Sequence, residues 1–339
     1  TAIAAQAFAC DTPVYRYAMY RWDPSPYEVY HFHSGDMEET FAAAKEKLNE
    51  ARDEKGAPLN VAVYPVDLAK DPELKTVPRD VRKIWEAKVD SGTKTPATLI
   101  VNPRGYEVHT GPLTESDIAA VTTSPARKEI GKLLSQGHCG VYVLVLGKDE
   151  TLNKAAQEAV DKVVKDVNSG DLSLYAGPDA RNPLGPQKKE SDEQDKEEAD
   201  AAEMPPHSAV SLTFTQKALQ AKDPWLFRSL MSVENDLYDF QEEPMLFVVY
   251  GRGRALPPYI GKGIAYENLV EVTDFITSAC SCTVKDQNPG VDLLMSFDWE
   301  SASAAVAKKF GSEEGNNETL EDLFPQLIFP GGPAPKEEE

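Results

Sequence analysis

The chain contains the same short pattern twice. Residues 95–105 read TPATLIVNPRG, and residues 243–253 read EPMLFVVYGRG. In each copy a proline opens an apolar strand, and an Arg-Gly pair follows the strand at the same offset. A second hydrophobic strand and an amphipathic helix come after each copy, which predicts a β-hairpin followed by a helix. The repetition therefore predicts that one α/β unit occurs twice in this chain.

The remaining elements predict one architecture for both units. Strands in the first unit are expected at 28–33, 60–66, 96–102 and 106–110, with helices at 37–52, about 71–90 and 114–134. Strands in the second unit are expected at 139–146, 208–216, 245–250 and 256–260, with helices at 152–167, 223–233 and 266–279. Alternating strands and helices favour parallel strands joined by right-handed crossovers, with a hairpin at the end of each unit.

A proline that opens the third strand of each unit resembles the thioredoxin fold, in which a cis-proline stands at this place and faces the active site. The resemblance covers most of residues 28–135 and 139–280. It implies an α/β fold of two tandem thioredoxin-like domains, each with a mixed sheet between helical layers. It also implies that both prolines are cis. The groove beside them would include Thr95, Pro96, Glu243 and Pro244.

The predicted domain boundaries follow from this repeat. Residues 1–10 form a signal-like start, 11–137 a first domain, 138–310 a second domain, and 311–339 a mostly disordered tail. Residues 11–27 are rich in aromatic residues and proline, and we expect them to pack against the first sheet. The insertion at 169–207 is rich in proline and charge, and it has too few apolar residues to offset the entropy of ordering.

The charge balance restricts the partners of the chain. Its 339 residues carry a formal net charge of -21, which argues against nucleic acid or an anionic membrane as a partner. No apolar run approaches the roughly 20 residues of a membrane span. We therefore expect another envelope protein or an extended peptide as the partner, and membrane contact only through a lipid anchor.

The first residues suggest export. Ala7 and Ala9 suit a signal peptidase, and Cys10 after them is a candidate for lipid attachment. The alternative is an alanine-rich first strand or helix. Residues 10–17, the Cys-x-Cys at 280–282 and residues 288–295 resemble a group of exported, lipoprotein-like bacterial proteins. That resemblance implies a bacterial envelope or periplasmic location and a shared fold, and it brings no activity with it.

Neither unit has the thiols of a catalytic thioredoxin. Such enzymes place Cys-x-x-Cys after the first strand, where a helix N-terminus lowers the pKa of the first thiol. The matching stretches, 33–38 and 147–151, contain no cysteine. The resemblance thus implies a non-catalytic relative with no catalytic residue and no cofactor.

Cys280 and Cys282 keep an enzymatic alternative open. Two thiols one residue apart can form a strained, easily reduced disulfide, which would suit a thiol–disulfide oxidoreductase. A structural or inert pair is the more common outcome, and a soft metal is a further option. The pair follows the second unit's last helix, so no helix N-terminus is expected to stabilise a thiolate there.

His31 and His33 alternate on a predicted strand, so both side chains should face one side of the sheet. With Asp36 nearby, they are candidates for a zinc or copper site. A buried, hydrogen-bonded histidine is the more common reading. An acidic divalent-metal-binding envelope protein, also suggested by the acidic run at 190–203, is therefore a second alternative.

Arg104 and Arg252 fall at the predicted hairpin turns. Each is followed by a glycine, which can adopt the positive φ that such turns require. We expect both arginines to be solvated turn residues. Taken together, the sequence favours a non-enzymatic binding or scaffold protein over an oxidoreductase.

Overall fold

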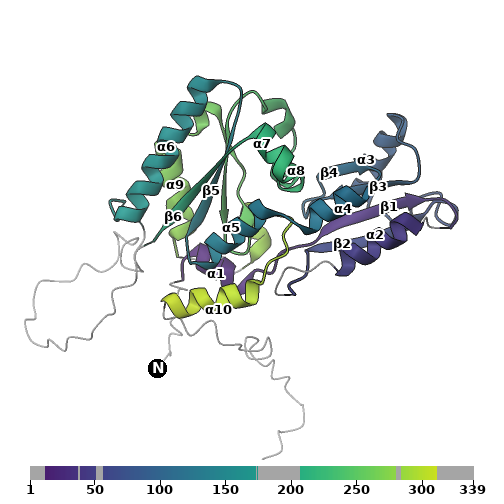
Figure 1. The fold of residues 1–339 in the computed structure, drawn as a ribbon, viewed down its shortest axis with the longest axis horizontal. Coiled ribbons are helices and arrows are strands. Elements are labelled where there is room, and N and C mark those ends of the chain that lie inside the picture. The colour runs from purple at the N-terminus through teal and green to yellow at the C-terminus, as the bar shows by residue number, and fades with distance from the viewer. Residues whose placement is uncertain are drawn as a thin grey trace, which may run out of the picture.

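The computed structural model describes residues 12–36, 39–50, 56–172, 174, 207–279 and 284–310. These residues form a mixed α/β structure with one four-stranded and one six-stranded sheet, each packed against helices (Figure 1). The expected mixed α/β class is thus confirmed. The insertion at 169–207 and the tail at 311–339 lie largely outside the described residues, as do residues 1–11.

The first sheet has the strand order β2-β1-β3-β4. Its strands are β1 (Tyr27–His33), β2 (Val61–Asp67), β3 (Ala97–Val101) and β4 (Glu107–Gly111). β1 and β2 are parallel, whereas β3 is antiparallel to both β1 and β4. Successive side chains of a strand point to opposite faces, so β1 contributes Val29 to one core and Phe32 to the other.

Helices cover both faces of this sheet. α2 (Glu39–Glu50) and α4 (Glu115–Thr122) bury Phe41, Leu48 and Ile118 in the core that contains Val29. On the opposite face, α3 (Arg79–Asp90) buries Val81 and Trp85 against Phe32.

The second sheet repeats the arrangement of the first. Its strands are β5 (Gly140–Leu146), β6 (Ala209–Thr215), β7 (Met245–Tyr250), β8 (Arg254–Ala255), β9 (Tyr259–Ile260) and β10 (Val291–Asp292). The path β6-β5-β7-β8 has the same order as β2-β1-β3-β4, with the first pair parallel and the others antiparallel. The second hairpin is more complex than expected, because β8 and β9 both pair with β7 and β10 extends the sheet beyond β8.

The helices on the second sheet come from several parts of the chain. α6 (Glu150–Ser169) and α9 (Tyr266–Thr277) cover one face, which also contains Tyr142 and Val248. α7 (Gln216–Lys222), α8 (Pro224–Met231) and α10 (Trp299–Phe310) cover the other face, which contains Val143 and Phe247. Short 3-10 turns are η2 (Leu237–Phe240), η3 (Gly261–Gly263) and η4 (Lys285–Gln287).

The helix expected at 114–134 is two helices. Ser124 accepts a hydrogen bond from the Arg127 backbone N–H, and Pro125 takes the first position of α5 (Pro125–Ser135). This capping pair ends the first helix and lets the chain change direction. α5 then leaves the first sheet and buries Ile130 and Leu134 in the core of the second.

The lead-in also packs on the second sheet, which corrects the expectation that residues 11–27 cover the first. Its helix α1 (Val14–Arg21) buries Tyr15 and Ala18 against the face that holds Tyr250. The Val14 backbone N–H donates to the Ser278 carbonyl at 2.8 Å. The second unit is therefore assembled from the lead-in, α5 and the segment from β5 to α10.

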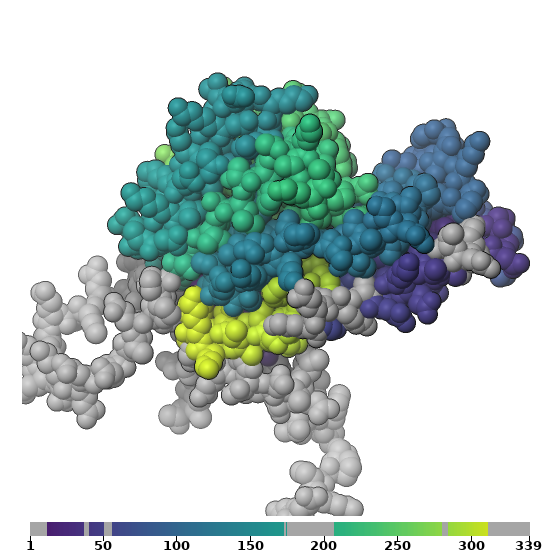
Figure 2. Space-filling view, viewed as in Figure 1, coloured from purple at the N-terminus to yellow at the C-terminus, as the bar shows by residue number. Residues whose placement is uncertain are grey.

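Buried groups fasten the two sheets to each other. Trp225 of α8 is fully buried in the core of the first sheet, and its indole N–H donates to the Asp117 carbonyl at 3.1 Å. Arg127 is buried between the units and donates to the carbonyls of Ala120, Val121 and Leu294 at 2.7–3.0 Å. Figure 2 shows the two units joined in one continuous surface. Among the described residues, no helix has the length and apolar character needed to cross a membrane.

Candidate functional site

The end of the first sheet brings the loop after β1 next to the start of β3. The register pairs Phe32 with Ala97, so His33 lies opposite Pro96. On the other side of β1, His33 pairs with Asp67 of β2. The Thr95–Pro96 peptide bond is cis, as expected. Residues 34–36, together with Thr95 and Pro96, are exposed at this edge.

His31 and His33 lie on the same face of β1 with their rings stacked 5.8 Å apart, as the alternation predicted. Both are buried and have local partners. The His31 ring lies 3.5 Å from that of Phe41 and bonds to the Thr98 hydroxyl at 3.0 Å, and His33 Nδ1 donates to the Gly35 carbonyl at 3.0 Å. Within the described part of the chain, no three His, Cys, Asp or Glu side chains form a metal-binding group, so the structure does not join Asp36 to the two histidines as a ligand set.

The corresponding groove of the second unit is closed, which corrects the expectation for Glu243 and Pro244. The bond before Pro244 is trans, because Thr95–Pro96 is the cis bond within the described residues. The loop after β5 fills the place beside it: the backbone N–H groups of Lys148 and Asp149 both donate to the Glu242 carbonyl, at 2.8 and 3.2 Å. A Cβ at Gly147 would lie 2.4 Å from the Glu242 carbonyl oxygen, so the two segments are in direct contact.

Arg252 is buried, which corrects the expectation of a solvated turn residue. Its guanidinium donates to the carbonyls of Met19 and Tyr20, at 2.7 and 3.0 Å, at the C-terminal end of α1. It also pairs with the exposed carboxylates of Asp23 and Glu300, at 2.5 and 2.8 Å. Carbonyls in the last turn of a helix lack an intrahelical donor, and a cation there also complements the helix dipole. Arg252 therefore attaches α1 to the β7–β8 hairpin.

The first hairpin docks in a similar way through a different residue. Asn102 is buried, and its side-chain amide donates to the Ser232 carbonyl at the C-terminal end of α8, at 2.5 Å. Its side-chain oxygen accepts from the backbone N–H groups of Arg104 and Tyr106. Arg104 itself is exposed, as expected, and pairs with Glu234 at 2.9 Å. Each Arg-Gly hairpin thus meets the end of a helix.

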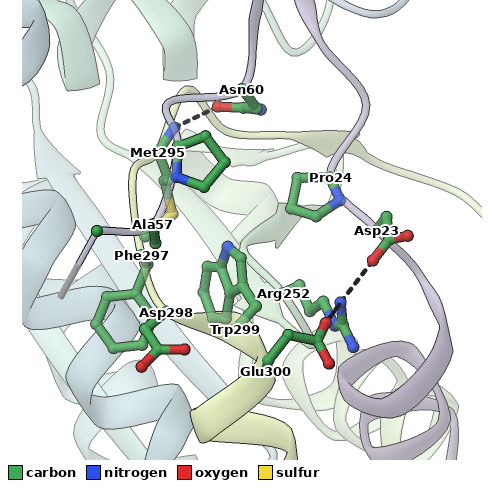
Figure 3. Close-up of a pocket in the computed structure, with 12 residues that line it drawn as sticks. Asp23, Pro24, Ala57, Asn60, Arg252, Met295, Phe297, Asp298, Trp299 and Glu300 are labelled. Atoms are coloured by element: carbon green, nitrogen blue, oxygen red, sulfur yellow. Dashed lines mark hydrogen bonds and ion pairs between the residues drawn. The ribbon is translucent and has the colours of Figure 1, made fainter. Parts of the chain in front are cut away.

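A pocket of about 520 Å³, here called the junction pocket, lies where four distant segments meet. They are the chain after α1, the chain before β2, the β7–β8 turn, and the chain leading into α10 (Figure 3). Its lining residues are Asp23, Pro24, Gly56, Ala57, Pro58, Asn60, Arg252, Met295, Phe297, Asp298, Trp299 and Glu300. Sequence reasoning missed this pocket. The one local signal was the dense Phe-Asp-Trp-Glu run at 297–300.

A second pocket of about 500 Å³ lies between β4 and η2, and it is lined mainly by polar side chains. His109 faces it beside the ring of Trp225, 5.6 Å away. Its Nε2 is buried and makes no hydrogen bond to any described residue. Burial lowers the pKa of His109, and the nearby Arg228 guanidinium lowers it further.

Cysteine chemistry is limited to one thiol within the described part of the chain. Cys139 is free and fully buried, and burial raises its pKa to about 12. A thiol in that state is a poor nucleophile, because only the thiolate attacks. The candidates for lipidation and redox chemistry, Cys10, Cys280 and Cys282, lie outside the described residues.

Comparison with family models, with curated proteins and with solved structures gave no match.

Proposed function

We propose that this protein is a non-enzymatic binding or scaffold protein built from two thioredoxin-like domains, and that the first domain holds an extended peptide at Thr95 and Pro96. The strand order and strand directions support the kinship of the two units. The stretches at 33–38 and 147–151 carry no thiol, which supports binding rather than disulfide exchange.

The observation that carries the proposal is the open edge of the first domain. Thr95 is exposed, and its backbone N–H and C=O form no hydrogen bond to another described residue. An extended peptide can use such free backbone groups as a strand partner, with side-chain pockets adding specificity. The exposed Ser34 and Gly35 lie across from it and would border the peptide on the other side.

The second domain is proposed to serve as the rigid support. Its corresponding edge is occupied by the bonds from Lys148 and Asp149 to Glu242, so it has no free backbone to offer there. This asymmetry gives the protein one peptide groove rather than two.

A panel of fluorescein-labelled, unstructured heptapeptides, measured by fluorescence polarisation, tests the proposal. We expect a subset of the panel to bind the full chain, and Ser34→Trp to abolish that binding by filling the groove. Thr95→Pro should weaken it, because this change removes the backbone N–H.

Lys148→Trp is the matched control, since this exposed residue occupies the equivalent loop in the second unit. It should leave binding unchanged. Absence of binding by every peptide, or equal loss with Ser34→Trp and Lys148→Trp, would overturn the proposed groove.

An envelope location belongs to the same proposal, and it rests on the resemblance carried by residues 10–17 and 288–295. Fractionation of cells that express the protein, followed by immunoblotting, tests it. Recovery in the cytoplasmic fraction alone would contradict it.

A further inference from the structure

We propose that the second pocket, between β4 and η2, binds a neutral sugar of one or two pyranose units. The pocket lies where β4 of the first unit faces the end of α8 and η2 of the second, and ligand sites are common at such junctions. Its volume of about 500 Å³ lies within the range of small-molecule sites in proteins. No residue of the peptide groove lines it, so this site goes beyond the function proposed above.

The frame of the second pocket is held by contacts within the protein. Lys88 and Glu107 form an ion pair at 2.7 Å, and the Thr110 hydroxyl donates to the other carboxylate oxygen of Glu107 at 2.8 Å. Glu234 pairs with Arg104 at 2.9 Å. These charges already have partners, so they fix the walls before a ligand arrives. A preformed site avoids the entropy of ordering its walls, which favours affinity for a small ligand.

A different set of polar side chains lines the same space without partners. No described residue forms a hydrogen bond or ion pair with the side-chain polar atoms of Tyr106, Asn235, Asp236, Tyr238 and Asp239. The set combines carboxylates, which only accept, with an amide and two hydroxyls, which both donate and accept. Sugar hydroxyls also donate and accept, so they match this mixture. An anion would instead meet two carboxylates, while the cations of the frame are already paired.

One acceptor in the wall lacks a donor. Burial and the Arg228 guanidinium lower the pKa of His109, so its ring is neutral at pH 7. The ring bonds to the Pro112 backbone, and the buried Nε2 makes no hydrogen bond, so Nδ1 carries the proton and Nε2 keeps a lone pair. Buried polar groups are normally hydrogen-bonded, and a sugar hydroxyl at this wall would supply the missing donor.

The aromatic side chains of η2 are exposed beside these polar groups. Tyr238 is 48% exposed and Phe240 is 42% exposed. An edge contact with Phe227, at 6.3 Å between ring centroids, holds the Tyr238 ring in place. The face of an aromatic ring carries partial negative charge, which attracts the C–H bonds on the flat face of a pyranose. A sugar can therefore stack on Tyr238 while its hydroxyls reach the polar wall.

Isothermal titration calorimetry of the full chain with maltose, methyl α-D-glucopyranoside and methyl β-D-galactopyranoside tests the proposal. We expect at least one of these neutral sugars to bind. Glucuronate should not bind, because its carboxylate would face Asp236 and Asp239. Putrescine, a cation without hydroxyl groups, should not bind either. Saturation-transfer NMR of the bound sugar should label the C–H protons of one face, the face that stacks on Tyr238.

Variants separate stacking from hydrogen bonding. Tyr238→Ala removes the aromatic face and should abolish binding, whereas Tyr238→Phe keeps that face and should weaken binding several-fold at most. Asp236→Asn combined with Asp239→Asn should weaken binding about tenfold, because a charged acceptor binds a hydroxyl more strongly than a neutral one. Asparagine tolerates the φ of +68° at Asp236, so the turn should keep its shape.

Tyr64→Ala is the matched control for Tyr238→Ala, since Tyr64 is 43% exposed and lies outside the pocket. Glu46→Gln combined with Glu86→Gln removes two exposed carboxylates elsewhere. Both controls should leave sugar binding unchanged. The proposal is overturned if none of the three sugars binds, or if Tyr238→Ala, in protein that melts like the parent, binds them equally well. Ser34→Trp, which blocks the peptide groove, should leave sugar binding intact, and this distinguishes failure of the sugar site from failure of the groove.

Discussion

At the scale of single residues, two arginines at the same offset in a repeated pattern have different surroundings. Arg252 is buried and donates to two carbonyls of α1, whereas Arg104 is exposed and forms an ion pair with Glu234. The difference arises because α1 ends against the second hairpin, while Asn102 takes over the docking of the first. The two arginines can therefore be compared directly, because they occupy the same position in the repeat and differ in their burial.

Arg252→Ala should lower the free energy of unfolding by about 3 kcal/mol, because two buried carbonyls lose hydrogen bonds to a charged donor, each contributing about 1.5–3 kcal/mol. Arg104→Ala should lower it by less than about 1 kcal/mol, as exposed ion pairs contribute little. Urea denaturation of both variants measures the difference. Equal losses would show that the guanidinium of Arg252 does not hold α1.

The buried thiol of Cys139 should be inert in the folded protein. Burial raises its pKa to about 12, so very little thiolate exists at neutral pH, and the side chain is inaccessible. In a variant with Cys10, Cys280 and Cys282 replaced by serine, Ellman's reagent should react only after urea unfolds the chain. Rapid reaction of the native variant would contradict the buried position of Cys139.

At the scale of elements, two helices belong to a different sheet from the one their sequence neighbours form. α1 precedes β1 in sequence and α5 follows α4, yet both pack on the second sheet. α1 can approach because Gly251 has no side chain: a Cβ there would lie 2.5 Å from the Ala18 Cβ. Its φ of +56° also favours glycine.

Gly251→Ala should therefore destabilise the protein more than Gly105→Ala. Both glycines have positive φ, and a side chain in that conformation costs about 1–2 kcal/mol. Only Gly251 has a helix within reach, since nothing lies within 4 Å of a Cβ at Gly105. The clash should add about 1–3 kcal/mol. Chemical denaturation of the two variants tests this, and a larger loss for Gly105→Ala would argue against the docking of α1.

At the scale of the whole molecule, the two units are joined by buried polar groups as well as by apolar contact. Arg127 lies 3.5 Å from the Asp223 carboxylate, and burial raises the pKa of Asp223 while the guanidinium opposes that rise. The Tyr27 hydroxyl bonds to that of Ser229 across the junction. Such directional contacts fix the orientation of one unit against the other.

Acid should weaken this junction through His109. Its pKa is lowered in the folded protein by burial and by Arg228, so the unfolded chain binds the proton more readily. The stability that neutral His109 contributes is therefore present above about pH 6.5 and is lost as the pH falls below that value. Burial also lowers the pKa of His138, which acts in the same direction.

Urea midpoints measured between pH 8 and 5 should decline for the parent and decline less for His109→Gln. The carboxylates with lowered pKa, such as Asp67 and Asp117, titrate below this window and do not confuse the result. An identical pH profile for parent and variant would exclude His109 from the acid response.

The sequence by itself determined the main strands of both sheets, the repeated proline-led strand and the order in which these occur, but not the division of the second hairpin into β8 and β9 nor the added strand β10. These features depend on local patterns: apolar runs such as 140–146, a proline before each third strand, and a glycine at each turn. Because the period of a strand and the φ of a turn are properties of neighbouring residues, the pattern alone predicts them. The same holds for the common face of His31 and His33.

Only the tertiary structure decided which sheet α1 and α5 cover, that Arg252 is buried, that the groove beside Pro244 is closed, and where the junction pocket lies. Each depends on groups far apart in the chain: Arg252 meets Asp23 across a separation of 229 residues, and Asn60 meets Met295 across 235. The composition and the hydrophobic periodicity of the sequence do not show which distant residues contact each other. Their energy comes from desolvated contacts that exist only when both segments are in place.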